Sequence, residues 1–274
     1  MEKKIEIIPP GFQSVNVYLI VKGAGRLLEF LKEAFGAEEK FRMPNGDGTL
    51  QHSEVRVGDV LLEAADAGGE WQAMPANLHY YVDNADRVYR QAVKAGATSL
   101  YEPREMAYGD REGGVKDSCG NNWFIATHKA GKSYRPEPLR DVTPGFSVRG
   151  AAEFLAFLEK AFDAEVLGRD ENKAGTVVHA VVRIGDTALE LSEAHGEWGP
   201  RPIGLHYYVE NCDVIFRGAV GAGAKPIYEV QDKPYGERNG GVQDAWGNQW
   251  YIATRLEVLS KEKLDAGAKA QTQF

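Results

Sequence analysis

The pentapeptide LHYYV occurs twice in the chain, as Leu78–Val82 and again as Leu205–Val209. The flanking residues agree as well, NLHYYVDN against GLHYYVEN. A short run of apolar and aromatic residues is typical of a buried β-strand. A histidine occupies the same place in both copies, so the fold and the function both depend on what surrounds these two side chains.

The repeat extends over almost the whole chain. At the spacing of the two pentapeptides, residues 15–128 align without a gap with residues 142–255, and about half of the aligned pairs are identical. A period this long indicates a duplicated domain rather than a solenoid. We therefore expect a first domain over 1–130, a linker rich in Pro, Lys and Arg over 131–141, a second domain over 142–258 and a polar tail over 259–274.

Each unit shows one order of elements twice. Residues 15–21 have the pattern of a buried strand, the following segment has helical spacing up to Gly36, and three further strand patterns follow. LHYYV opens the second half, where Asn84 or Asp86 can cap a helix that ends at Gly96, before three more strands. The unit therefore reads βαβββ–βαβββ, which predicts an α+β fold with four such modules in the chain.

The composition excludes several classes of protein. The chain has 274 residues, a net charge of −8 and no tract rich in Lys or Arg, which argues against nucleic-acid and membrane partners. No apolar run is long enough to span a bilayer, and the N-terminus lacks the pattern of a signal peptide, so we expect a cytoplasmic protein. Cys119 and Cys212 are not equivalent in the repeat, which favours free thiols over a disulfide or a zinc site.

Several repeated motifs carry a family resemblance. FLKEAFGAEE, HSEVRVGD and YGDREGGVKDSCGNNWFIATH, with their counterparts FLEKAFDAEV, HAVVRIGD and YGERNGGVQDAWGNQWYIATR, resemble the glyoxalase / bleomycin-resistance / extradiol-dioxygenase superfamily, and most of all its PhnB-like branch. The resemblance implies two tandem domains, each of paired βαβββ modules that form a half-barrel around a small-molecule cavity. It also implies an internal pseudo-dimer, and leaves further homodimerisation open.

The resemblance places metal ligands on the first, fourth, fifth and last strands of a unit. Those positions are Asn16, Glu63, His79 and Phe124 in the first unit, and Thr143, Glu190, His206 and Tyr251 in the second. Glutamate and histidine are the residue types that metal-dependent relatives use. Asn16 and Phe124, and likewise Thr143 and Tyr251, depart from that pattern, which weakens the case for a metal.

A third-strand histidine offers a replacement ligand. Strand alternation places His52 on one face with Glu54 and Arg56, and the smaller residues between them on the face toward the helices. His52, Glu63 and His79 would then form a set on the cavity side, matched by His179, Glu190 and His206. Such a set suits a divalent metal (Zn, Mn, Ni or Fe), a metal-free binding or acid–base pair, or a purely structural hydrogen-bonded cluster.

Other repeated residues are candidates for the cavity lining. Trp71 and Trp198, in matching GEW segments, could form a cavity wall or fill the core. In the loops YGDR and YGER, Tyr108 with Arg111 and Tyr235 with Arg238 could hold an anionic group at the mouth, although Arg111 could instead pair with Asp117.

Three functional hypotheses follow. The first is a small-molecule-binding glyoxalase-like protein acting as a divalent-metal-dependent lyase, isomerase or dioxygenase. The second is a metal-free ligand-binding or sequestering protein of the bleomycin-resistance type. The third is a duplicated scaffold without catalysis. The retained histidines and glutamates favour the first hypothesis, and the missing ligands favour the other two.

Overall fold

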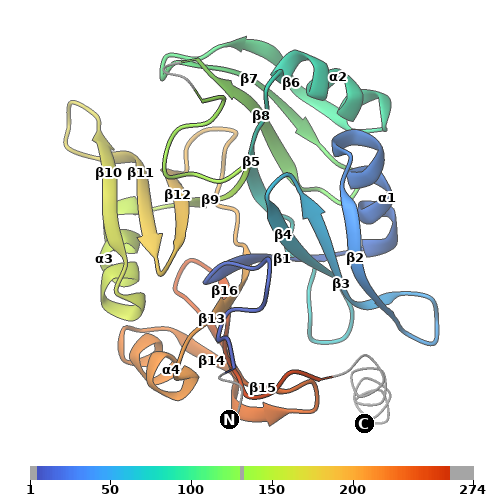
Figure 1. The fold of residues 1–274 in the computed structure, drawn as a ribbon. Helices are drawn as coiled ribbons and strands as arrows, with labels where there is room; N and C mark the ends of the chain where they lie inside the picture. Colours follow the sequence, from blue (N-terminus) through green and yellow to red (C-terminus); the bar gives the residue numbers. More distant parts are fainter. Residues whose placement is uncertain (1–4, 130–132, 260–274) are drawn as a thin grey trace.

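The computed structural model describes residues 5–129 and 133–259. In the first half of the chain, the elements follow the order expected from the sequence (Figure 1): β1 (Val15–Val21), α1 (Ala24–Phe35), β2 (Glu38–Pro44), β3 (Leu50–Val57), β4 (Val60–Asp66), β5 (Asn77–Tyr81), α2 (Ala85–Lys94), β6 (Thr98–Glu105), β7 (Asp110–Lys116) and β8 (Asn122–His128). This order agrees with the βαβββ–βαβββ pattern that the sequence predicts for one unit.

The second half repeats this order: β9 (Val142–Val148), α3 (Ala151–Phe162), β10 (Glu165–Glu171), β11 (Val177–Ile184), β12 (Thr187–Glu193), β13 (Gly204–Tyr208), α4 (Cys212–Gly221), β14 (Lys225–Lys233), β15 (Glu237–Gln243) and β16 (Gln249–Arg255). None of the described helices is long and apolar enough to cross a membrane. Cys119 and Cys212 are both free, as expected. The expected polar tail lies outside the described residues except at its first residue.

Local signals fix the helix ends. The side chain of Asn84 accepts a hydrogen bond from the Arg87 backbone N–H, which confirms Asn84 as the N-cap of α2. Helix α1 ends at Gly36, whose φ of 66° is the left-handed conformation that glycine adopts at low cost. At the other end of α1, Asp66 accepts hydrogen bonds from the backbone N–H groups of Gly23 and Ala24. The carboxylate thus satisfies donors that a helix start leaves unpaired.

The sheet topology differs from the simplest reading of the repeat. One eight-stranded sheet has the order β14-β15-β16-β13-β1-β4-β3-β2, and the other has the order β10-β11-β12-β9-β5-β8-β7-β6. The first module therefore shares a sheet with the fourth, and the second module with the third. The expected pairing of modules within each half is wrong. Because β5 and β13 carry the same pentapeptide, the strand pattern alone fits either partner for β1.

The two modules of each half lie in different sheets but pack together through their helices. Helix α1 packs against α2, and α3 packs against α4, so each half of the chain has its own helical layer while it contributes strands to both sheets (Figure 1). The described core between helices and sheets is continuous, and includes the fully buried Trp123 and Trp250. The two halves can therefore come apart only if both sheets are broken at their centres.

Candidate ligand-binding sites

The first site, called the terminal site here, lies on the open face of the sheet formed by β1–β4 and β13–β16. Strand alternation sets which side chains reach this face. Leu205 and Tyr207 of β13 are buried in the core beneath the helices, so His206 between them points the other way. Glu63 of β4 and Glu237 of β15 reach the same face from neighbouring parts of the sheet. The site thus combines residues from the two ends of the chain.

His206 is held between two carboxylates. Its Nδ1 lies 3.0 and 3.1 Å from the two carboxylate oxygens of Glu63, and its Nε2 lies 3.6 Å from Oε2 of Glu237. Burial by itself lowers the pKa of His206, but the charges of Glu63 and Glu237 outweigh burial and raise this pKa to about 10. The ring is therefore an imidazolium at neutral pH, and it packs on Tyr208 with centroids 4.3 Å apart.

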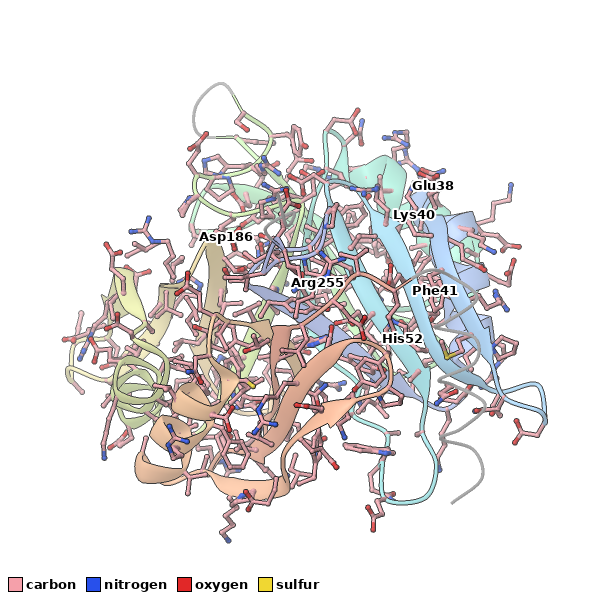
Figure 2. The ribbon with its side chains drawn as sticks, turned by 60° about the horizontal axis from the view of Figure 1, so that its bottom comes forward. Glu38, Lys40, Phe41, His52, Asp186 and Arg255 are labelled. Atoms are coloured by element: carbon pink, nitrogen blue, oxygen red, sulfur yellow. The ribbon has the colours of Figure 1, made fainter. Side chains whose placement is uncertain are left out.

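His52 lies at the rim of the terminal site. Its Nδ1 is 3.1 Å from the hydroxyl of Tyr18, and its Nε2 is 3.6 Å from Glu54 and 3.9 Å from Glu63. Phe41 lies on the neighbouring strand, with its ring centroid 5.9 Å from the imidazole (Figure 2). The expectation that alternation turns His52 toward the open face agrees with these contacts.

Aromatic rings surround the terminal site. Trp71, from the loop after β4, meets Tyr228 and Tyr251 edge-on at centroid distances of 6.0 and 5.7 Å. Tyr18 packs against Tyr251 at 5.6 Å. The hydroxyl of Tyr235 accepts a hydrogen bond from the amide of Asn239. Tyr251 stands beside His206 in the strand register, and Trp71 packs on Tyr251 from the opposite half of the chain.

The second site, called the central site here, lies on the sheet formed by β5–β8 and β9–β12. His79 is again held between carboxylates, with Nδ1 3.1 Å from Glu190 and Nε2 3.1 Å from Glu112. Burial by itself lowers the pKa of His79, but Glu190 and Glu112 raise it to about 10. Burial would raise the pKa of Glu190, but the histidine charges lower it to about 2. This cluster therefore keeps its charges across the neutral pH range.

The second carboxylate comes from different positions in the two sites. Glu112 aligns with Asn239 in the repeat, and Glu237 aligns with Asp110. Tyr108 and Tyr101 both donate hydrogen bonds to Glu112 through their hydroxyl groups. Asp110 instead pairs with His128, at 2.6 Å from Nδ1. Each site thus places two carboxylates around the histidine of its LHYYV strand. The second carboxylate comes from positions that are not equivalent in the repeat.

The rim of the central site is less enclosed. His179 lies 3.5 Å from Glu190 and 3.7 Å from Asp170, and its pKa is raised mainly by the hydrogen bond to Glu190. Trp198 meets Phe124 and Tyr101 edge-on at centroid distances of 5.7 and 6.2 Å. Trp198 therefore corresponds to Trp71 as an aromatic wall, again facing a module from the other half.

The expected histidine–glutamate sets are only partly brought together. His52 and Glu63 lie in the terminal site with His206, whereas His79 lies in the central site with Glu190 and His179. The grouping of His52, Glu63 and His79 is therefore wrong, and so is its counterpart with His206. The cause is the exchange of modules between sheets: Asn16 of β1 stands opposite His206, not His79.

Four of the predicted lining residues have other roles. Arg111 and Arg238 point away from the sites, because they alternate along β7 and β15 with residues that face them. Arg111 binds Asp86 of α2, and Arg238 binds Asp213 of α4, so the suggested partner Asp117 is also wrong. The other two residues, Asn16 and Thr143, form hydrogen bonds that close turns. The amide of Asn16 bonds to the Gln13 backbone, and the hydroxyl of Thr143 donates to the Arg140 carbonyl.

Sequence reasoning missed Glu112 and Glu237. The search for shared chemistry relied on residues that recur in both halves, and neither glutamate has an identical partner in the repeat. The signal that could have found them is alternation along β7 and β15, where a residue two places from an inward-facing one shares its face.

The donor sets do not fit a divalent metal. Among the residues that the structure describes, no three His, Cys, Asp or Glu side chains converge as metal ligands. A ligating histidine must be neutral, whereas His79 and His206 are protonated and meet a carboxylate at each ring nitrogen. The imidazolium thus supplies the positive charge that the carboxylates would otherwise offer to a cation.

Two hollows in the described surface lie outside these sites. One of about 370 Å³ lies between α1, α2 and the segment before β9, and includes Phe35, Arg87 and Tyr134. The other, of about 550 Å³, lies at the start of α3 around Gly150 and Trp246. Neither contains the paired carboxylates or the aromatic walls. The candidate sites are therefore distinguished from these hollows by their buried histidine–glutamate clusters.

The fold and the sites define a duplicated α+β protein with small-molecule sites on two sheets, each assembled from paired βαβββ modules. Residues 13–125 and 143–252 match the family model described as Glyoxalase/Bleomycin resistance protein/Dioxygenase superfamily, and the chain belongs to this superfamily. Glyoxalase I from Zea mays has a similar fold, with a TM-score of 0.67 at 12% identity over 95% of this chain and 96% of that chain.

Sequence relatives cover about one of the two units. An uncharacterised protein of Mycobacterium bovis is 28% identical over 141 residues, which are 47% of this chain and 93% of the relative. An uncharacterised protein of Mycobacterium tuberculosis matches with the same identity over 83% of its length. At 12% identity, the likeness to glyoxalase I concerns the fold alone.

Proposed function

We propose that the chain is a metal-free binding protein whose two sites take flat aromatic ligands that carry a positive charge. The observation that carries this proposal is the buried imidazolium between two carboxylates, set beside aromatic walls. In the terminal site His206 supplies one positive charge against Glu63 and Glu237. In the central site His79 does the same against Glu190 and Glu112. Two carboxylates therefore face one imidazolium at the centre of each cluster, and in the central site His179 adds positive charge beside Glu190 at the rim.

The ligand chemistry follows from what the cluster leaves open. A carboxylate offers about four lone-pair sites, so Glu237 and Glu112 can each accept from a ligand donor in addition to their present partners. Neither His206 Nε2 nor His79 Nε2 has a well-aligned hydrogen bond, although both atoms are buried. Trp71 packs on Tyr228 and Tyr251 at the terminal site, and Trp198 packs on Phe124 and on Tyr101, whose hydroxyl donates to Glu112. Aromatic side chains attract a cation over their faces by about 0.5–2 kcal/mol, depending on desolvation.

The charge states favour binding over proton transfer. General acids and bases work best when their pKa lies near the working pH. The pKa of His79 is raised to about 10 and that of Glu190 is lowered to about 2, so each group keeps its charge at neutral pH. This argues against the alternative in which these residues act as an acid–base pair. It supports a fixed electrostatic receptor.

Benzamidine and benzoate provide a matched test, because they share a flat ring and differ in charge. Titration calorimetry of the full chain should show two equivalents of benzamidine and no benzoate. Trp71→Ala and Trp198→Ala should each remove about one equivalent. Val214→Ala, an exposed change on α4, should leave both. Addition of EDTA should change nothing. Benzoate binding, or full benzamidine binding by the double tryptophan variant, would overturn the proposal.

A further inference from the structure

Two rings narrow the terminal site. Tyr18 stands beside Glu63 in the strand register, and its hydroxyl contacts His52. Phe41 approaches the same histidine from β2 (Figure 2). With both rings in place, the side chain of His52 is 23% exposed. Tyr18 and Phe41 therefore both contact His52, whose Nε2 lies 3.9 Å from Glu63 at the rim of the site.

Glycine replaces both rings in the central site. Gly145 aligns with Tyr18 and stands beside Glu190, and Gly168 aligns with Phe41 on β10. Neither glycine has a positive φ, so the backbone does not require glycine at these positions. A Cβ at Gly145 would meet its nearest neighbour at 3.8 Å, and one at Gly168 would meet nothing within 4 Å. The side chain of His179 is accordingly 38% exposed.

We propose that Tyr18 and Phe41 limit the terminal site to ligands with a single ring, whereas Gly145 and Gly168 let the central site accept two or three fused rings. This inference rests on the proposed function, because it concerns the size of the same class of ligand. The chain is then a receptor for two different ligands rather than two copies of one. The space beside Glu190 admits the added rings, while Glu112 and Trp198 hold the charged end.

The test compares 9-aminoacridine, a flat cation with three fused rings, with benzamidine. The wild-type chain should bind one equivalent of 9-aminoacridine and two of benzamidine. Gly145→Tyr combined with Gly168→Phe should remove 9-aminoacridine and retain benzamidine. A Cβ at Gly168 meets nothing within 4 Å, and one at Gly145 makes ordinary contact with Asn77 at 3.8 Å. Tyr18→Gly combined with Phe41→Gly should raise 9-aminoacridine binding to two equivalents.

The outcomes separate the two proposals. If benzamidine fails to bind the wild-type chain, the proposed function is wrong, and the size rule fails with it. If benzamidine binds at both sites but 9-aminoacridine also binds at both, or at neither, the size rule alone is wrong. Retention of 9-aminoacridine by the Gly145→Tyr, Gly168→Phe variant would also overturn it. Thermal unfolding of each variant confirms that the protein under test is folded.

Discussion

The terminal and central sites surround their histidines in the same way with different residues. Both histidines come from the LHYYV strand, and both meet a glutamate of the neighbouring module at Nδ1. At Nε2 the central site uses Glu112 at 3.1 Å, whereas the terminal site uses Glu237 at 3.6 Å, from a strand position two residues earlier in the repeat. A buried imidazolium requires compensating charge, and either of two positions on one strand face can supply it.

The largest expected effect is a loss of stability when the positive charge of His79 is removed from the central site. His79→Leu leaves Glu112 buried without its positive partner and Glu190 with His179 alone, and breaking a buried ion pair in this way costs about 3–5 kcal/mol. His206→Leu should cost less, because Glu237 lies further from the ring than Glu112 does. Urea unfolding at pH 7 measures both free energies of unfolding. Equal losses, or losses below that of a conservative surface change such as Val214→Ala, would contradict this comparison.

The pH dependence of the free energy of unfolding, measured on the wild-type chain and the histidine variants, shows whether the loss of stability comes from the histidine charge. The folded pKa of His79 and of His206, about 10, lies above the ordinary value of 6.5. Their contribution is therefore complete below pH 6.5 and is lost as the pH rises toward 10. From pH 6.5 to 7.5 the free energy of unfolding should fall by on the order of 1 kcal/mol for each histidine, about 2 kcal/mol for the two together. The His79→Leu, His206→Leu double variant should show a flatter profile, whereas a purely steric effect of leucine would leave the slope unchanged.

The next effect tests whether the two carboxylate positions are interchangeable. Glu237→Gln removes one of the two charges that raise the pKa of His206, so this pKa should fall by on the order of one unit, or about 1.4 kcal/mol. Adding Asn239→Glu places a carboxylate at the position that Glu112 occupies in the central site. The second change should restore the pKa of His206, measured by NMR titration of the ring protons.

A matched control lies at the far end of the same strand, β15. Gln243→Glu adds a carboxylate to the same strand at the end remote from Arg238 and should not restore the pKa. Restoration by Gln243→Glu would show that any added negative charge is sufficient. No restoration by Asn239→Glu would show that the strand position of the carboxylate is not interchangeable, and the parallel between the two sites would then be only apparent.

Alternation and repetition carry most of what the sequence reveals. The order βαβββ, the N-cap at Asn84 and the inward direction of His52, His79 and His206 all follow from local patterns. The histidine that pairs with Glu63 cannot be identified from these local patterns. LHYYV is identical in β5 and β13, so the pattern that locates the histidines also conceals which histidine reaches which sheet. Only the pairing of β1 with β13 decides it.

The second carboxylates were hidden for the opposite reason. Glu112 and Glu237 differ from their repeat partners, so a search for shared residues passes over them. Arg111 and Arg238 are shared and therefore attracted attention, but they alternate with the inward residues and face the helices. Residues retained in both halves thus include helix anchors as well as site residues, and only the strand face distinguishes them.

The smallest expected effect concerns those two arginines. Arg111 and Arg238 bind Asp86 and Asp213 on the outer side of their sheets, where both partners are partly exposed. Ion pairs exposed to solvent contribute little to stability. Arg111→Ala and Arg238→Ala should therefore lower the free energy of unfolding equally and slightly, and leave benzamidine binding unchanged at both sites. If either variant lost a binding equivalent, the arginines would belong to the sites after all. The difference between terminal and central sites would then no longer reside in the carboxylates and glycines alone.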